Sequence, residues 1–254
     1  MKEKFRSRQR LFGAWVSFSH PSIAEMFSSI MKPDFLGIDM EHSTISQAEA
    51  QRIIAATQAS GVACFPRVAS HNGEQIRRLL DSGADGIMVP MVNSKEEIRQ
   101  IVEWCKYPPV GKRGFGVSKA QGYGGRYDEY TKSWNEKGVL LVQIESVRGV
   151  EAVDEIVANE HVDGVMIGPY DISGSLGIPG KLNDPRVLKA CDRVIEACQK
   201  YNKACGNQEV DPNEENVRKA FDRGFTFVVL ASDLFLIWKW SEKMRNLTGL
   251  IRKI

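Results

Sequence analysis

Two acidic residues, Glu145 and Asp171, follow short apolar runs in the sequence, and their side chains are of the type that binds hard divalent cations. Two carboxylates, water and a chelating substrate would complete an octahedral shell around Mg²⁺ or Mn²⁺. An ordinary ion pair would explain either residue equally well, and Asp171, which precedes Ile172-Ser173, would also suit a helix N-cap. Residue type and spacing therefore leave a metal site and a structural role open.

A basic residue and a histidine occupy comparable positions. Arg67 ends a short apolar run, and its planar guanidinium is suited to hold a carboxylate or an enolate oxygen beside a metal, although a structural salt bridge is the alternative. His42 follows another such run, and imidazole titrates in the range needed to transfer protons. We expect no catalytic part for the remaining histidines, His20, His71 and His161.

The elements that must position these residues recur regularly along the chain. Eight short β-rich runs are predicted as strands: Phe12–Phe18, Phe35–Asp39, Ala63–Arg67, Gly86–Pro90, Val139–Glu145, Gly164–Gly168, Ala204–Gln208 and Phe225–Leu230. Segments with apolar residues three and four positions apart follow them and are predicted as helices: Ile23–Met31, Ser46–Ala59, Gly73–Asp81, Lys95–Trp104, Gly149–Val157, Pro185–Lys200, Asn213–Arg223 and Asp233–Met244.

Eight strand–helix units within 254 residues predict an α/β fold, a (β/α)8 TIM barrel that occupies residues 1–254 as a single domain. An open doubly wound sheet is the alternative, but no Gly-x-Gly-x-x-Gly motif follows the first strand. In barrels of this type the active site is built at the carboxyl ends of the strands. We therefore expect Glu145, Asp171, Arg67 and His42 to converge at one end of the barrel.

Composition argues against several other classes of protein. The chain has 34 Lys and Arg against 32 Asp and Glu, a formal net charge of +2, which gives no reason to expect binding to nucleic acid or to an anionic membrane. No apolar run approaches the roughly 20 residues of a membrane-spanning helix, and the first residues lack the features of an export signal. Five cysteines without a Cys-x-x-Cys pair argue against a disulfide framework or a zinc ribbon and favour a reducing, cytoplasmic location.

Two segments depart from the regular pattern. Cys105–Lys137 is rich in glycine and is expected to be a long loop; its glycines would suit an anion, but the segment matches no Walker motif. Asp233–Met244 carries apolar residues on too many faces for a solvated helix. We expect this last helix, about residues 233–245, to pack either on a neighbouring subunit or on its own barrel.

Seven motifs occur along the chain, from Phe12 to about Ala231, and carry a family resemblance. They are Ile38-Asp39-Met40-Glu41-His42, Pro66-Arg67-Val68, Leu79–Ala84, Val89-Pro90-Met91-Val92, Tyr107-Pro108-Pro109 with Lys112–Gly116, Val142-Gln143-Ile144-Glu145 and Asp163–Ser173. Together, and in this order, they resemble the HpcH/HpaI family of class II, metal-dependent pyruvate aldolases.

The resemblance implies a (β/α)8 barrel that assembles as a homo-oligomer, either a trimer or a hexamer built as a dimer of trimers. It implies a divalent metal, Mg²⁺ or Mn²⁺ with Co²⁺ or Zn²⁺ as alternatives, held by Glu145 and Asp171, with Gln143 beside it. Arg67 would contact the keto oxygen of pyruvate. The backbone N–H groups of Tyr170 and Asp171 would hold the pyruvate carboxylate.

The resemblance also implies acid–base chemistry by His42 together with Asp81, with Asp39 as a neighbouring acidic position. The expected reaction is the reversible cleavage of 4-hydroxy-2-oxo acids or 2-keto-3-deoxy sugar acids to pyruvate and an aldehyde. The metal and Arg67 would stabilise the pyruvate enolate, and no strand offers a lysine for a Schiff base.

Two departures from the family's pattern concern the aldehyde half of the substrate. They are Val117–Gln121 with the following Gly122–Tyr127, and the polar seventh strand that contains Asn207. Two alternatives to an aldolase stay open. One is another carbon–carbon lyase on the same metal site, similar to citrate lyase or malyl-CoA lyase or forming its enolate by decarboxylation; the other is a ligand-binding barrel without turnover. The expected ligand is a small-molecule 2-oxo acid.

Overall fold

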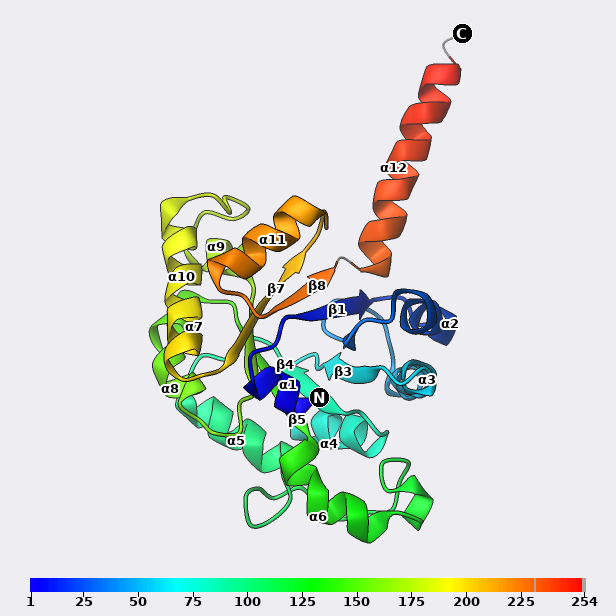
Figure 1. The fold of residues 1–254 in the computed structure, drawn as a ribbon, viewed down its shortest axis with the longest axis vertical. Helices are drawn as coiled ribbons and strands as arrows, with labels where there is room; N and C mark the ends of the chain where they lie inside the picture. Colours follow the sequence, from blue (N-terminus) through cyan, green and yellow to red (C-terminus); the bar gives the residue numbers. More distant parts are fainter. Residues whose placement is uncertain (231, 253–254) are drawn as a thin grey trace.

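The computed structural model describes residues 1–230 and 232–252, and in this part of the chain eight parallel strands close into a barrel (Figure 1). Each strand pairs with its neighbours in chain order, and the first pairs with the last. The strands are β1 (Leu11–Val16), β2 (Phe35–Asp39), β3 (Ala63–Arg67), β4 (Gly86–Val89), β5 (Val139–Ile144), β6 (Gly164–Ile167), β7 (Ala204–Glu209) and β8 (Phe227–Leu230). The predicted barrel is confirmed.

Helices connect the strands on the outside of the barrel and match the predicted ones. They are α2 (Pro21–Met26) with a π-helical turn η1 (Phe27–Met31), α3 (Gln47–Ala59), α4 (Gly73–Asp81), α5 (Lys95–Cys105), α7 (Val147–Glu151), α8 (Val153–Val157), α10 (Pro185–Lys200) and α11 (Glu214–Arg223). Local sequence sets their starts. Ser46, for example, begins α3 with a capping box in which Glu49 takes the reciprocal hydrogen bond.

Three further helices in the described part of the chain lie outside the predicted set. They are α1 (Lys2–Arg6), α6 (Tyr127–Lys137), which follows a short 3-10 turn η2 (Gly122–Gly124), and α9 (Pro169–Ser175). Trp134 of α6 is buried, and its Nε1 donates a hydrogen bond to the carbonyl of Cys105 at 2.8 Å. The expectation of a loop throughout Cys105–Lys137 is therefore wrong in its last third, because α6 packs against the end of α5.

Two apolar layers make up the core, one inside the barrel and one between the strands and the helices. Successive side chains along a strand alternate between the two layers. Phe35, Phe65 and Phe227 thus point into the barrel, whereas the residues that follow Phe35 and Phe227 pack under the helices. All five cysteines are free and buried.

The helix α1 (Lys2–Arg6) closes the base of the barrel, the end at which the strands begin. The ring of Phe5 is fully buried, and its centroid lies 5.7, 5.9 and 5.5 Å from those of Phe35, Phe65 and Phe227. Tilted and edge-to-face ring pairs of this kind add to the stabilisation from apolar burial. One aromatic residue near the N-terminus therefore fills the barrel from below.

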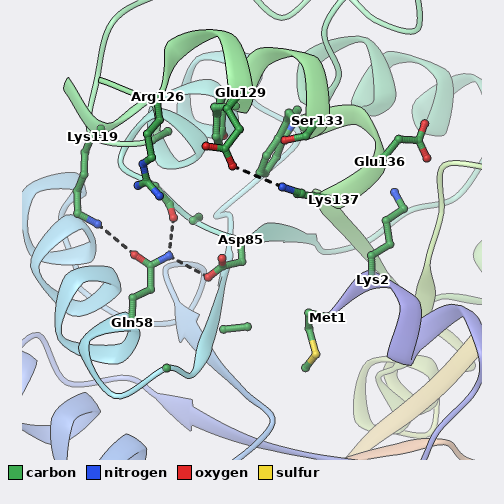
Figure 2. A pocket seen from close by; sticks show the side chains of 18 of the residues that line it. Met1, Lys2, Gln58, Asp85, Lys119, Arg126, Glu129, Ser133, Glu136 and Lys137 are labelled. Carbon is green, nitrogen blue, oxygen red and sulfur yellow. Dashed lines mark hydrogen bonds and ion pairs between the residues drawn. The ribbon is translucent and has the colours of Figure 1, made fainter. Parts of the chain in front are cut away.

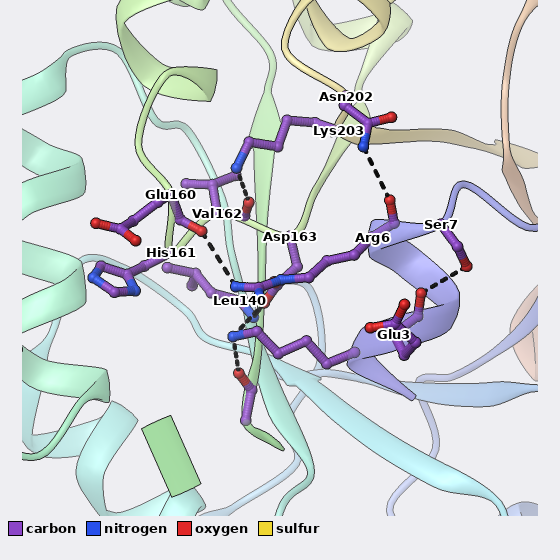
Figure 3. A network of polar contacts seen from close by, with 12 residues as sticks. Glu3, Arg6, Ser7, Leu140, Glu160, His161, Val162, Asp163, Asn202 and Lys203 are labelled. Atoms are coloured by element: carbon purple, nitrogen blue, oxygen red, sulfur yellow. Dashed lines mark hydrogen bonds and ion pairs between the residues drawn. The ribbon is translucent and has the colours of Figure 1, made fainter. Parts of the chain in front are cut away.

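Buried charge holds this helix in place (Figure 3). The carboxylate of Asp163 is fully buried and lies 3.3 Å from Lys2 Nζ and 3.3 Å from Arg6 Nε. Asp163 also accepts a hydrogen bond from the backbone N–H of Leu140 at 2.9 Å. A single carboxylate thus joins α1 to β5, and the two cations compensate for its burial.

A cavity of about 970 Å³ lies at the same end of the molecule, between α1, the end of α3 and the segment that carries α6 (Figure 2). Charges of both signs line it. Lys119 Nζ donates to Gln58 Oε1 at 3.1 Å, and Gln58 Nε2 donates to Asp85 Oδ2 at 2.9 Å. The cavity is therefore at the opposite end from the expected active site.

The helix α12 (Asp233–Ile251) leaves the barrel after β8 and projects away from it (Figure 1). Apolar side chains on this helix are close to half exposed or more; among them are Leu236 (49%), Ile237 (51%), Trp238 (50%) and Trp240 (63%). Its first residue, Asp233, is buried against the barrel and accepts hydrogen bonds from the backbone N–H groups of Ser17 and Phe18, whereas these apolar side chains are exposed in a single copy. Neither α12 nor another helix in the described part of the chain is long and apolar enough to cross a membrane.

Candidate active site

The carboxyl ends of the strands form the mouth of the barrel, opposite α1. Asp39, Arg67 and Gln143 occupy inward-facing positions at or near the ends of β2, β3 and β5, and Glu145 directly follows β5. Asp39 and Arg67 are register partners in adjacent strands. All four side chains are buried. The structure therefore brings three of the predicted site residues together with Asp39.

Three side chains fix the guanidinium of Arg67. Its Nη2 lies 2.8 Å from Asp39 Oδ1, its Nη1 lies 3.0 Å from Glu41 Oε2, and Nη1 also donates to Gln143 Oε1 at 3.4 Å. The guanidinium carbon lies 5.0 Å from the centroid of the Trp15 ring, in a cation–π contact. The structural salt bridges considered from the sequence are thus present, and they hold the guanidinium at the mouth.

Asp39 also organises the turn that follows β2. Its Oδ1 accepts hydrogen bonds from the backbone N–H groups of Glu41 at 3.1 Å and His42 at 3.0 Å. This turn brings Glu41 to the mouth, where desolvation raises the pKa of the Glu41 carboxyl and the neighbouring Arg67 opposes the rise. Glu41 is therefore a further carboxylate of the site.

Hydrogen bonds hold both carboxylate oxygens of Glu145. Oε1 accepts from Gln143 Nε2 at 2.9 Å, and Oε2 accepts from the backbone N–H of Met91 at 2.9 Å. Desolvation raises the pKa of Glu145 to about 7; the Met91 N–H opposes this rise, and the charges of Glu41 and Asp171 add to it. Glu145 pairs here with amide groups, which is not the ion pair considered from the sequence.

Asp171 lies in the first turn of α9 and is exposed. The helix N-cap is Gly168, so the N-cap alternative for Asp171 is wrong. A side chain at Gly168 would place its Cβ 2.8 Å from Glu145 Oε1, which shows how closely this turn approaches that carboxylate. Glu145 directly follows β5 and Asp171 lies in the helix that directly follows β6, so the chain places both predicted metal ligands at the same end of the barrel.

The donor set fits a divalent cation. The negative charges of Glu41 and Asp171 contribute to the raised pKa of Glu145. Carboxylate oxygens such as those of Glu145 and Asp171 are the donors that Mg²⁺ and Mn²⁺ prefer. In residues 1–230 and 232–252 there is no group of three or more His, Cys, Asp or Glu side chains arranged to hold a metal ion. A cation held by two protein carboxylates would take its remaining ligands from water and substrate.

His42 lies at the rim of the mouth. Its side chain is 69% exposed, and its Nε2 lies 3.7 Å from Glu41 Oε2. The imidazole is therefore open to solvent and to a molecule that covers the mouth, while the hydrogen bond from its backbone N–H to Asp39 fixes the main chain.

Asp81, the expected partner of His42, lies at the other end of the same barrel. It is the last residue of α4, which follows β3 and runs back toward the base. Its Oδ1 lies 2.7 Å from Arg113 Nη2, and its carbonyl accepts a hydrogen bond from the N–H of Ala120. Within one chain, the two predicted acid–base residues therefore do not meet.

The two segments that depart from the family's pattern lie at different ends of the barrel. Tyr123 lines the cavity at the base and is 75% exposed. In β7, Asn207 is the register partner of Val228, which packs under the helices, whereas Gln208 pairs with the inward-facing Val229. Gln208 rather than Asn207 therefore faces the barrel interior near the mouth.

Three contributors to the mouth carry little signal in the sequence. The Trp15 ring supports Arg67, Glu41 adds a carboxylate, and Met91 contributes only its backbone N–H. Because side chains alternate between the two faces of a strand, the predicted first strand would place Trp15 on the inner face of the barrel. A residue that contributes only its backbone N–H, such as Met91 with its positive φ of 52°, cannot be recognised from its residue type.

Comparison with known proteins places this arrangement among relatives. The profile of the HpcH/HpaI aldolase/citrate lyase family matches residues 11–239. The 5-keto-4-deoxy-D-glucarate aldolase of Escherichia coli O6:H1 (strain CFT073) is 33% identical over 245 residues, which are 96% of this chain and 94% of that enzyme.

Two crystal structures share the fold over their whole length. An HpcH/HpaI aldolase/citrate lyase family protein from Burkholderia cenocepacia J2315 superimposes with a TM-score of 0.91 at 27% identity, and the match covers 98% of each chain. The citrate synthase SbnG superimposes with a TM-score of 0.87 at 25% identity, covering 100% of this chain and 99% of SbnG.

Proposed function

The chain belongs to the HpcH/HpaI aldolase/citrate lyase family, and from that premise we propose that it is a class II aldolase that reversibly cleaves 2-keto-3-deoxy sugar acids, or related 4-hydroxy-2-oxo acids, to pyruvate and an aldehyde. The observation that carries this proposal is the oriented Arg67 guanidinium beside the Gln143–Glu145 pair at the mouth. The likeness to the 5-keto-4-deoxy-D-glucarate aldolase supports a sugar acid as the substrate.

Glu145 and Asp171 would hold the divalent metal, Mg²⁺ or Mn²⁺ with Co²⁺ or Zn²⁺ as alternatives. When bound, such a cation supplies positive charge to the oxygens of the 2-oxo acid. The hydrogen bonds from Gln143 and from the Met91 N–H would orient Glu145 for this role, as partners of metal ligands do elsewhere.

Cleavage breaks the C3–C4 bond of the substrate and leaves its electron pair on the pyruvate half as an enolate. Arg67 would donate hydrogen bonds to the oxygen on which this charge develops. Its guanidinium is already oriented by Asp39, so little reorganisation is needed in the transition state. The backbone N–H groups of Tyr170 and Asp171, in the first turn of α9, would hold the substrate carboxylate.

A proton must leave the C4 hydroxyl as the aldehyde forms. His42 would accept it, directly or through one water, because its imidazole is exposed at the rim of the mouth. The enolate is then protonated at C3 to give pyruvate. The same groups act in reverse order in the synthetic direction.

His42 and Asp81 would act together only between two copies of the chain. The support for this is their position at opposite ends of one barrel. Exposed apolar side chains on α12, with Trp240 63% exposed, support self-association as well. We therefore propose a homo-oligomer, a trimer or a hexamer, in which α12 packs on a neighbouring subunit.

The proposed reaction is tested with 2-keto-3-deoxy sugar acids, the purified protein and Mn²⁺ or Mg²⁺, with pyruvate measured in a coupled assay. We expect turnover that EDTA abolishes and added metal restores. Cleavage that persists after complete chelation would contradict a class II mechanism.

The shared site is tested by mixing two variants of strongly reduced activity, His42→Ala and Asp81→Asn, during assembly. Activity should rise well above that of either variant alone, because some sites then combine an intact His42 from one copy with an intact Asp81 from another. Mixtures that never exceed the activity of the separate variants, although the two assemble together, would contradict a site shared between subunits.

A second candidate is carbon–carbon bond formation or cleavage on citrate, favoured by the likeness to the citrate synthase SbnG. The same residues would serve, since this chemistry also passes through a stabilised carbanion next to a carboxylate. Parallel assays for citrate formation and citrate cleavage separate this reaction from release of pyruvate from sugar acids.

A further inference from the structure

Arg113 is a basic residue enclosed in the protein interior. Its side chain is fully buried, and its guanidinium carbon lies 4.7, 5.5 and 4.9 Å from the ring centroids of Tyr107, Tyr130 and Trp134. We call these three rings the aromatic cage. Cation–π attraction offsets part of the cost of removing a guanidinium from water, but a buried charge still requires an anionic partner.

That partner is Asp81. Arg113 Nη2 lies 2.7 Å from Asp81 Oδ1, and Nη1 donates to the hydroxyl of Tyr130 at 3.1 Å. The N–H of Ala120 donates to the carbonyl of Asp81 at 3.1 Å. Both the side chain and the main chain of Asp81 are therefore held by the segment that follows α5.

The two members of this ion pair differ in exposure. The side chain of Arg113 is fully buried, whereas that of Asp81 is 36% exposed. If the pair served only to anchor the segment, a buried carboxylate would provide stronger pairing because solvent would screen it less. The observed arrangement instead holds one end of the carboxylate from inside and leaves the group accessible from outside.

We propose that Arg113, oriented by the aromatic cage, is a positioning residue that holds Asp81 in the direction in which it meets His42 of a neighbouring copy. This inference rests on the proposed function, in which Asp81 and His42 act together. Arg113 itself contacts no substrate. Its contribution is to keep a partly exposed carboxylate from turning away, and it therefore affects turnover more than substrate binding.

The test is a double-mutant cycle on the full-length, metal-loaded enzyme, with pyruvate release as the readout. Arg113→Met, Asp81→Asn and the double variant are compared with the wild type, and Lys112→Met, an exposed neighbour paired with Glu103, is the matched control. We expect Arg113→Met to lower kcat about 10- to 100-fold with KM changed less than about 3-fold, and to cause no further loss in the Asp81→Asn background. Arg113→Lys should recover part of kcat.

Several outcomes overturn the inference. One is an assembled Arg113→Met variant with wild-type kcat; another is a loss of equal size in both backgrounds, which indicates a structural role alone. Wild-type kcat in Asp81→Asn also overturns it, because Arg113 would then have nothing to position. Should Arg113→Met fail to fold, Arg113→Lys replaces it in the cycle. A wild type that cleaves no 4-hydroxy-2-oxo acid contradicts the proposed function itself, which separates that failure from a failure of the Arg113 inference.

Discussion

Without a substrate, Arg67 already pairs with two carboxylates, Asp39 at 2.8 Å and Glu41 at 3.0 Å. A buried guanidinium needs such partners, because an unpaired charge inside the barrel would destabilise the fold. A 2-oxo acid must therefore add its oxygens to an existing network. The same residue then serves both the stability of the mouth and the proposed enolate.

Replacing Arg67 with Ala should lower kcat/KM for pyruvate release by about 10²- to 10³-fold, because one preorganised donor to the developing charge is lost. Arg67→Lys, which keeps the charge but not the planar fork, should recover only part of the activity. Circular dichroism and thermal melting check that the variants are folded. Wild-type kinetics in Arg67→Ala would remove this residue from the mechanism.

A second residue-scale prediction concerns Lys106, far from the mouth. Its Nζ donates to the carbonyls of Asn135 and Gly138 beside Lys2 and Asp163, and burial, with a smaller contribution from the Lys2 charge, lowers the pKa of Lys106 to about 7. In the unfolded chain the lysine keeps its proton up to about pH 10.5. Between pH 7 and 10.5 unfolding therefore takes up a proton, and the contribution of Lys106 to the free energy of unfolding rises with pH.

Urea denaturation at pH 7 and pH 9.5 measures this effect. The wild type should gain stability relative to Lys106→Met across this range, because methionine keeps the apolar stem but cannot titrate. Lys132→Met, an exposed lysine on α6, should behave as the wild type does. Parallel stability profiles for the wild type and Lys106→Met would show that Lys106 is not the titrating group.

At the mouth, residue types were informative for the side chains that are proposed to take part in the reaction. Arg67, Gln143 and Glu145 are brought together as the sequence predicts, since each stands at or just beyond the end of a strand. The position of Asp81 also follows from the predicted elements. A helix that follows a barrel strand runs back toward the base, so the last residue of the predicted helix Gly73–Asp81 lies at the end opposite His42. The resemblance, which pairs the two residues, does not by itself reveal this separation.

Among the elements, α1 contributes more to the core than its five residues suggest. Phe5→Ala should lower the free energy of unfolding by about 3–5 kcal/mol, because it removes a fully buried ring from among Phe35, Phe65 and Phe227. Phe18→Ala, at a position 38% exposed, should cost about 0.5 kcal/mol. Chemical denaturation of both variants checks the difference, and equal losses would contradict the packing described for α1.

The alternation of strands and helices was predictable because each strand is a short apolar run and most helices have a clear apolar face. Two helices lack that signal. In α6 the apolar contacts reduce largely to Tyr130 and Trp134, four residues apart in an otherwise polar segment, and α9 spans only seven residues with Gly174 inside it. Tertiary packing, above all the burial of Trp134, stabilises α6 where local pattern does not.

For the whole molecule, the exposed apolar side chains of α12 are the basis of the proposed assembly. Ile237→Asp combined with Trp240→Asp should reduce the number of subunits in the assembly, because two charges would enter the apolar contact proposed for this helix. Lys243→Asp, which changes an exposed residue of the same helix, should not. Light scattering coupled to size-exclusion chromatography measures the mass, and an unchanged mass in the double variant would contradict a contact through α12.

Because Phe5 closes the base of the barrel, we expect substrate to enter and products to leave through the mouth. Since the pyruvate half is proposed to lie against Arg67 and Glu145 and the aldehyde half nearer the rim, we expect the aldehyde to leave before pyruvate. Steady-state kinetics of such an ordered mechanism have a recognisable form. Pyruvate, the last to leave, competes with incoming sugar acid for the vacant enzyme, whereas the aldehyde inhibits by returning to the enzyme–pyruvate complex.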